Sequence, residues 1–122
     1  MAGNMNDLHA FRFNLDGTAG PFNFTCTRGW HVLDVIGLTQ LGAGGGGETA
    51  ALNRATAAAP TVFNNVSVTA LAIDTADDIE YVDGLVTAQL TFSTGDIMQV
   101  AVANTPTAEV IAEVLPTTWI PG

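Results

Sequence analysis

The sequence contains no lysine, and its only fixed positive charges are Arg12, Arg28 and Arg54. Twelve carboxylate residues outnumber them and give the chain a formal net charge of −9. Binding to nucleic acid requires several cations that displace the counterions of the phosphates, and binding to an anionic membrane requires a similar basic cluster. The composition therefore excludes both partner classes and favours neutral or basic partners, or contacts made by apolar and backbone groups.

Cysteine and long apolar runs are equally scarce. Cys26 is the only cysteine, so no disulfide can form within the chain, and its place in a strand-like pattern predicts a small buried side chain. No apolar run approaches the roughly 18 residues of a membrane-spanning helix, and residues 1–8 lack the basic and apolar parts of a secretory signal. We therefore expect a soluble, single-domain protein, because 122 residues suffice for one packed core.

Motifs that carry catalytic or cofactor chemistry are missing as well. His9 and His31 are the only histidines, and they form neither an H-x-H nor an H-E-x-x-H pattern, which argues against a metal site. Ser67 and Ser93 lie outside any G-x-S-x-G turn. The glycine-rich stretch at 42–47 has no lysine to reach a phosphate, so we interpret it as a surface loop. No catalytic residue, cofactor site or metal ligand is predicted, and an enzyme is the least favoured class.

A group of carboxylates gathers between residues 74 and 83. Its spacing lacks the pattern and the bidentate glutamate of an EF-hand, so a solvated acidic loop is the favoured interpretation. A weak calcium site, for example at an interface, is the alternative that the sequence leaves open. The group consists of Asp74, Asp77, Asp78, Glu80 and Asp83.

Apolar residues recur at every second position in the first part of the chain, which is typical of β-strands with one buried face. Residues 9–15 and 22–27 follow this pattern on either side of a stretch rich in turn residues, so they predict a hairpin. Residues 30–38 are more uniformly apolar and predict a central strand that is covered on both faces.

The second half of the chain continues the strand pattern, after one ambiguous segment. Residues 48–59 are undecided between a helix, which their alanines favour, and a short strand before Pro60. Residues 85–93 alternate most regularly and predict a hairpin with residues 97–103. Residues 108–115 form the last expected strand.

These segments together predict seven to nine short strands in one all-β domain, arranged as an antiparallel sandwich or a barrel. We expect the domain to span residues 9–115, with a flexible arm at 1–8 and a tail at 116–122. Its core is predicted to contain Phe11, Phe13, Phe22, Phe24, Trp30, Val32, Ile36, Leu90, Phe92, Val100 and Val102.

The order of features from Trp30 onward has a known counterpart. A strand that opens with this aromatic residue is followed by the glycine-rich loop at 42–47, by Leu52-Asn53, and later by an acidic segment and the alternating stretch at 94–100. This order resembles the head decoration (cement) and minor capsid proteins of tailed phages. The tail at 116–122 extends beyond the pattern of that family, which leaves the role of the tail in doubt.

The resemblance implies a jelly-roll β-sandwich without catalytic activity that bridges neighbouring major capsid subunits and stabilises the shell. It also implies a homo-oligomer, with a trimer favoured over a dimer, on the outer surface of the virion head, after assembly in the host cytoplasm. Nucleic acid, membranes and cofactors are not expected as partners.

Contacts with the shell are expected from the two chain ends and from the glycine-rich loop. Polar ends can become ordered on docking, and aromatic residues dominate interface hot spots. For Trp119 the alternative of packing against its own sandwich stays open. The candidate interface residues are Met1, Asn4, Met5, Leu8, Gly44, Gly45, Trp119 and Ile120.

Two further functions compete with this hypothesis. The chain would also suit another virion component, such as the base of a head fibre or a tail module. A ligand-binding or carbohydrate-binding β-sandwich would display exposed aromatic residues beside polar groups, and Trp30, Tyr81 and Trp119 are few and scattered for that purpose.

Overall fold

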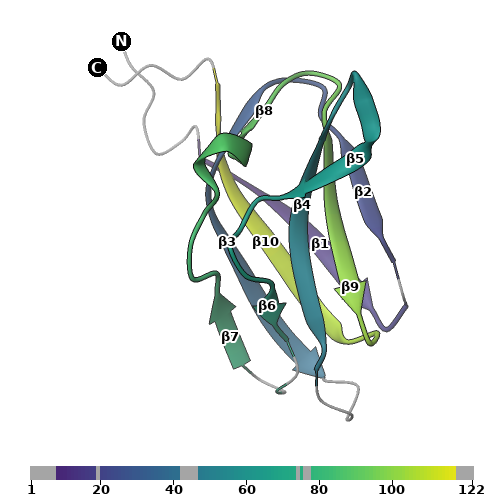
Figure 1. Cartoon of the computed structure of the whole chain (residues 1–122). Coiled ribbons are helices and arrows are strands. Elements are labelled where there is room, and N and C mark those ends of the chain that lie inside the picture. Colours follow the sequence, from purple (N-terminus) through teal and green to yellow (C-terminus); the bar gives the residue numbers. More distant parts are fainter. Residues whose placement is uncertain (1–7, 19, 42–46, 74, 76–77, 118–122) are drawn as a thin grey trace.

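The computed structural model describes residues 8–18, 20–41, 47–73, 75 and 78–117, and these form two antiparallel β-sheets packed face to face (Figure 1). The predicted all-β sandwich is confirmed, and this part of the chain contains ten strands where seven to nine were expected. Several of them are only two to four residues long, which explains the difference in number.

Each sheet has five strands. In the first, which we name sheet A, the order is β1 (His9–Asp16), β10 (Thr107–Pro116), β3 (Trp30–Leu41) and β7 (Asp78–Tyr81), and β8 (Thr91–Phe92) also pairs with β3. In the second, sheet B, the order is β2 (Phe22–Thr25), β9 (Ile97–Ala103), β4 (Thr49–Thr56) and β5 (Ala59–Asn65), and β6 (Leu71–Ala72) also pairs with β4.

The chain changes sheet at six of the nine connections between its described strands. β1 pairs with β10, whereas β2, which follows it in the sequence, pairs with β9 in the other sheet. The two predicted hairpins, 9–15 with 22–27 and 85–93 with 97–103, are therefore wrong. The alternating pattern showed that these segments have one buried face, but a buried face does not say which strand lies beside it.

A bulge in β3 changes which of its side chains face the core. The register of β3 against β10 shifts at Leu33, so the inward positions run through Val32 before the bulge and Val35 after it. Both valines are at most 1% exposed. Ile36 consequently faces outward, and its predicted place in the core is wrong. Leu33 is 42% exposed, so the prediction of a strand covered on both faces is wrong as well.

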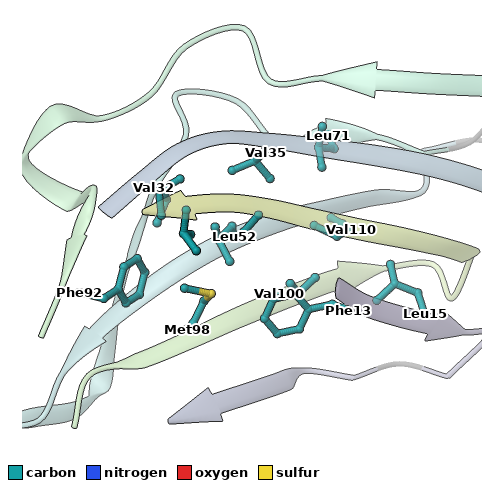
Figure 2. Close-up of a cluster of buried hydrophobic side chains, with 14 of the residues drawn as sticks. Phe13, Leu15, Val32, Val35, Leu52, Leu71, Phe92, Met98, Val100 and Val110 are labelled. Atoms are coloured by element: carbon teal, nitrogen blue, oxygen red, sulfur yellow. The ribbon is translucent and has the colours of Figure 1, made fainter. Parts of the chain in front are cut away.

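The core lies between the inner faces of the two sheets (Figure 2). Residues from both halves of the chain meet there, which a single-domain sandwich requires. The predicted core residues that are buried are Phe13, Trp30, Val32, Phe92 and Val100. Those that are partly buried and pack against the core are Phe11, Phe22, Phe24, Leu90 and Val102. Buried residues that the prediction lacked include Leu15, Leu52, Met98 and Val110.

Aromatic rings join the two sheets near one end of the core. The ring of Phe11 on β1 lies 4.8 Å from that of Phe24 on β2, and 5.1 Å from that of Trp30 on β3. The Phe11–Trp30 pair is edge-to-face and the Phe11–Phe24 pair is tilted, and such aromatic pairs add to the stability that burial provides.

The ambiguous segment at 48–59 contains strand β4 and the turn that follows it. β4 pairs with β9 on one side and with β5 and β6 on the other, and Ala50 and Leu52 are buried in the core. Hydrogen bonds to strands on both sides therefore outweigh the helix preference of the alanines, which is weak for each residue.

The segment from 82 to 90 closes one edge of the sandwich instead of forming the long strand that we predicted. Its backbone bonds to residues 66–68, which connect β5 to β6 of sheet B. The contacts are a bridge between Ser67 and Leu85 and a hydrogen bond from the Val86 N–H to the Val66 carbonyl (2.8 Å). A short 3-10 helix, η2 (Thr87–Gln89), follows, and only the last two residues before Ser93 are in β8. The two sheets are thus joined by backbone hydrogen bonds at this edge.

Cys26 follows β2 and is 1% exposed, which confirms the predicted small buried side chain. Its N–H donates to the Asp96 carbonyl (2.9 Å), and its own carbonyl accepts from the Gly95 N–H (2.8 Å). Burial raises the pKa of the thiol from 9.0 to about 11, and the nearby Asp96 carboxylate adds to this increase.

We expect the Cys26 thiol of the native protein to resist a disulfide reagent at mildly alkaline pH, and to react at once in denaturant. Because the folded pKa is the higher one, the protonated thiol stabilises the fold fully below the unfolded value of 9.0, and this contribution falls as the pH rises towards 11. Absorbance after addition of the reagent, with and without guanidinium, checks the first expectation. Rapid modification of the native protein would contradict it.

Candidate protein-binding face

The structure leaves most of the predicted interface residues untested. Met1, Asn4, Met5, Gly44, Gly45, Trp119 and Ile120 lie outside the described residues. Leu8, which is described, is half-buried and directly precedes β1. The docking role of the two ends and of the glycine-rich loop therefore stays a prediction.

The two histidines lie on opposite faces of sheet A and cannot share a metal ion. His9 pairs with inward-facing Val114, and its ring packs edge-on against Trp30 at 5.1 Å. His31 faces outward, where its Nδ1 lies 3.1 Å from the Thr91 hydroxyl. Ser67 donates its hydroxyl to the Thr69 carbonyl (2.7 Å) and not to a histidine. In the described part of the chain, neither histidine is hydrogen-bonded to a serine or an aspartate, as a Ser-His-Asp triad would require.

The acidic group at 74–83 falls partly outside the described residues, which do not include Asp74 and Asp77. Asp78 accepts a hydrogen bond from the Ile79 N–H through its Oδ1 (3.0 Å). Among the residues that the structure describes, no three histidine, cysteine or acidic side chains are placed to hold one metal ion. The weak calcium site stays a prediction.

No helix in the described residues is long and apolar enough to span a bilayer.

Strand β7 has its apolar side chains on the solvent side. Ile79 and Tyr81 are 57% and 60% exposed. Asp78 and Glu80, which alternate with them, pair with the inward-facing positions of β3 and are half-buried. This pattern is the reverse of an ordinary edge strand, which directs apolar residues inward and polar residues outward. Single exposed apolar residues are common on folded proteins, whereas a contiguous group of them indicates a binding surface.

Neighbouring strands extend this apolar surface across sheet A. Ile36 and Leu38 of β3 are the cross-strand partners of Tyr81 and Ile79, and Ile36 also pairs with Ile111 of β10. Ile111 is only 8% exposed, although it lies outside the core cluster, because its neighbours on the face cover it. We name this surface the outer face of sheet A. Its apolar members are Leu33, Ile36, Leu38, Ile79, Tyr81, Ile111 and Leu115.

Carboxylates are interspersed with these apolar residues. Asp34 and Glu113 are direct partners across β3 and β10 and are both half-buried. The Asp34 Oδ1 accepts a hydrogen bond from the Val35 N–H (2.8 Å), and neither carboxylate has a basic partner in the described residues. Glu109 on the same face forms an ion pair with Arg12. Like charges directly opposite each other on a sheet are destabilising, so this pair favours a binding partner that supplies a cation.

A hollow of about 510 Å³ borders this face, where β3 and β8 begin and β10 ends. Its lining includes His31, Leu33, Thr91 and Leu115. The side chains are mainly hydroxyl and apolar groups, so the hollow could receive a side chain from a partner protein without any chemical step.

The comparisons with known proteins give no independent assignment, because no family model, no curated protein and no solved structure matches this chain. The candidate site therefore depends on the geometry alone. Of the carbohydrate-binding aromatics considered above, Trp30 is 7% exposed and so cannot form a sugar platform, and Trp119 is not described. Tyr81 is exposed but lies among apolar neighbours.

The sequence contains two signals for this face that the predicted interface residues do not include. Apolar residues alternate with acidic ones at Ile79 and Tyr81, as in an ordinary half-buried strand, and the pattern alone cannot say which set faces the core. A second signal is Ile111, which lies between Glu109 and Glu113 at a spacing of two residues. Positions two residues apart on a strand share a face, so Ile111 had to lie beside the carboxylates.

Proposed function

We propose that this chain is a non-enzymatic structural protein that binds a protein shell through the outer face of sheet A, and that the shell is the head of a tailed phage, which the chain decorates and stabilises. One observation carries the proposal. The face combines exposed Leu33, Ile79 and Tyr81 with the carboxylate pair of Asp34 and Glu113, for which the described residues provide no basic partner.

A protein surface suits this face better than a small molecule does. Apolar groups at its centre favour burial against another apolar surface, at roughly 25 cal/mol for each Å² removed from water. Asp34 and Glu113 would pair with lysine or arginine on the partner, which adds specificity and speeds association. The partner that fits is therefore a protein with an apolar patch next to basic residues.

The fold and the charge support a shell in particular. Jelly rolls are rigid sandwiches that recur in viral capsids, and here backbone hydrogen bonds also join the two sheets at one edge. A net charge of −9 disfavours contact with a packaged genome. The resemblance of the chain from Trp30 onward to phage decoration proteins agrees with both features.

Co-sedimentation with DNA-free shells, assembled from the major capsid protein of the same virus, tests the proposal. We expect wild-type protein to bind and Ile79→Glu to bind at least about tenfold more weakly, since loss of a hot-spot side chain costs more than about 1–2 kcal/mol. Val62→Glu is the matched control, because Val62 is also 57% exposed but lies on β5 of sheet B. It should bind like wild type.

Two outcomes would overturn the proposal. Wild-type protein that does not sediment with expanded or unexpanded shells would exclude decoration, and labelled particles in negative stain would then show whether it belongs to a fibre or tail. Equal binding by the Ile79→Glu and Val62→Glu variants would mean that the shell is bound through another surface. Truncation of residues 1–7 and 118–122 would then test the two chain ends that the sequence predicted.

A further inference from the structure

The strands of sheet B are almost free of charge. Arg54 is their only charged residue, and it points inward to an ion pair with Asp96 (3.2 Å). Sheet A is the opposite case. Its strands carry Asp16, Asp34, Asp78, Glu80, Glu109 and Glu113 against the single arginine Arg12.

A row of carboxamides crosses the outer face of sheet B. The strand registers place Asn23, Gln99, Asn53 and Asn65 side by side on β2, β9, β4 and β5. Asn53 donates through its Nδ2 to the Gln99 Oε1 (3.2 Å), while its own Oδ1 accepts no hydrogen bond. Asn53 and Gln99 in the middle of the row are each only 8% exposed, so Asn23 and Asn65 at its two ends are the exposed amides. We name these four residues the amide row.

Uncharged residues, most of them small, flank the amide row on both sides. Ala51 and Ala101 are cross-strand partners on one side, and Thr25, Ile97 and Ala55 align on the other. Alanine side chains allow the backbone of a second sheet to approach closely, and stacked sheets pack about 10 Å apart. The strands of this surface are therefore almost free of charge, and Asn23 and Asn65 can form hydrogen bonds with a partner.

We infer that the outer face of sheet B binds a second copy of this chain, with the exposed amides Asn23 and Asn65 of the two copies at an interface with two-fold symmetry. A two-fold interface brings a patch against itself, so the patch must be complementary to itself. Carboxamides meet this condition because each carries both a donor and an acceptor. Carboxylates do not, since they only accept, and they repel their own copies.

Charge decides which face can mediate this contact. Two molecules of net charge −9 repel each other, and contact through sheet A would bring Asp34, Glu109 and Glu113 against the same residues of the second copy. Contact through sheet B adds no carboxylate to the interface. The inference does not depend on the proposed shell function, because it concerns the opposite face and leaves the outer face of sheet A free.

Analytical ultracentrifugation of the full chain tests the inference. We expect a reversible dimer that becomes tighter as sodium chloride is raised, because salt screens the repulsion between the two acidic molecules while the interface itself contains no ion pairs. Asn23→Asp should raise the dissociation constant at least about tenfold, since like charges that meet at an interface cost several kcal/mol. Asn65→Asp, at the other end of the row, is the second test variant.

Asn14→Asp is the matched control, because Asn14 is exposed on β1 of sheet A and the change adds the same charge with the same shape. It should leave the dimer unchanged beyond the small effect of net charge. A monomer at all concentrations, a mass of three copies, or equal dissociation by Asn14→Asp and Asn23→Asp would each overturn the inference. A monomer that binds sugars through its amide row on a glycan array would also overturn the inference, and would show that this face binds a carbohydrate.

Discussion

Replacement of Asp96 with alanine is expected to lower the free energy of unfolding by about 3–5 kcal/mol, the usual cost of removing one member of a buried ion pair. The Asp96 side chain is 5% exposed and forms an ion pair with Arg54, whose side chain is 19% exposed. Without Asp96 the guanidinium keeps its hydrogen bond to Gln89 (3.1 Å) but loses its only neighbouring negative charge in the described residues.

Asp96 also holds two turns together, which increases the expected loss. Its carboxylate accepts hydrogen bonds from the Ser93 N–H (2.9 Å) before β9 and from the Ala57 N–H (3.2 Å) in the turn between β4 and β5. Both hydrogen bonds are partly buried, so the loss of each one costs about 1 kcal/mol. The total is a large share of the roughly 5–15 kcal/mol that stabilises a typical domain.

Urea denaturation monitored by circular dichroism measures this effect. Asp83→Ala is the control, because Asp83 is exposed and exposed substitutions usually change the stability by less than about 0.5 kcal/mol. Combining Asp96→Ala with Arg54→Met should cost less than the sum of the two single changes, because the double variant has no unpaired buried charge. Equal midpoints for Asp96→Ala and Asp83→Ala would show that the carboxylate does not tie the turns together.

Phe92→Ser is expected to cost about 4–6 kcal/mol, which combines the cavity left by a large core side chain with an unsatisfied buried hydroxyl. Phe92 is fully buried between the sheets (Figure 2), and the Arg54 guanidinium lies over its ring at 5.9 Å from the centroid. The substitution therefore removes a core contact and an aromatic partner of the ion pair. A fall in melting temperature of at least about 10 °C should result for a domain of this size.

Tyr81→Ser provides the comparison for Phe92→Ser. Tyr81 is also aromatic but is 60% exposed on the outer face of sheet A. Its loss should change the melting temperature little, while it removes part of the proposed binding surface. If the Phe92→Ser variant melted at the wild-type temperature, β8 would not be part of the core.

The two-residue period predicted the fold class because it depends only on burial. Phe13 and Val100 were assigned to the core correctly, since a strand with one buried face shows its inner positions in the sequence. Ile36 was assigned wrongly because the bulge at Leu33 shifts the period by one residue, and no turn residue marks the bulge. The strand predicted at residues 85–93 was wrong for a different reason. These residues form a bridge to Ser67 and a short 3-10 helix at the edge of the sandwich, although their apolar residues alternate as in a strand.

Pairing between strands, and with it the candidate site, could not be read from the local pattern. The amide row forms only because four strands from different parts of the chain bring Asn23, Gln99, Asn53 and Asn65 into register. The role of Asp96 was hidden in the same way. The Gly95-Asp96 pair indicated a turn, but its partner Arg54 lies on another strand. The residues predicted for the interface came from the chain ends and the glycine-rich loop, and none of them belongs to the described strands of the two sheets.

The uneven distribution of charge between the sheets gives the molecule an electrical polarity. Arg54 is the only charge on the strands of sheet B, whereas the strands of sheet A carry six carboxylates and one arginine. In the field of a basic surface, a molecule with such a dipole turns while it is still diffusing, so that its negative side arrives first. Productive collisions then become more frequent than random orientation allows, and the gain diminishes as ionic strength rises.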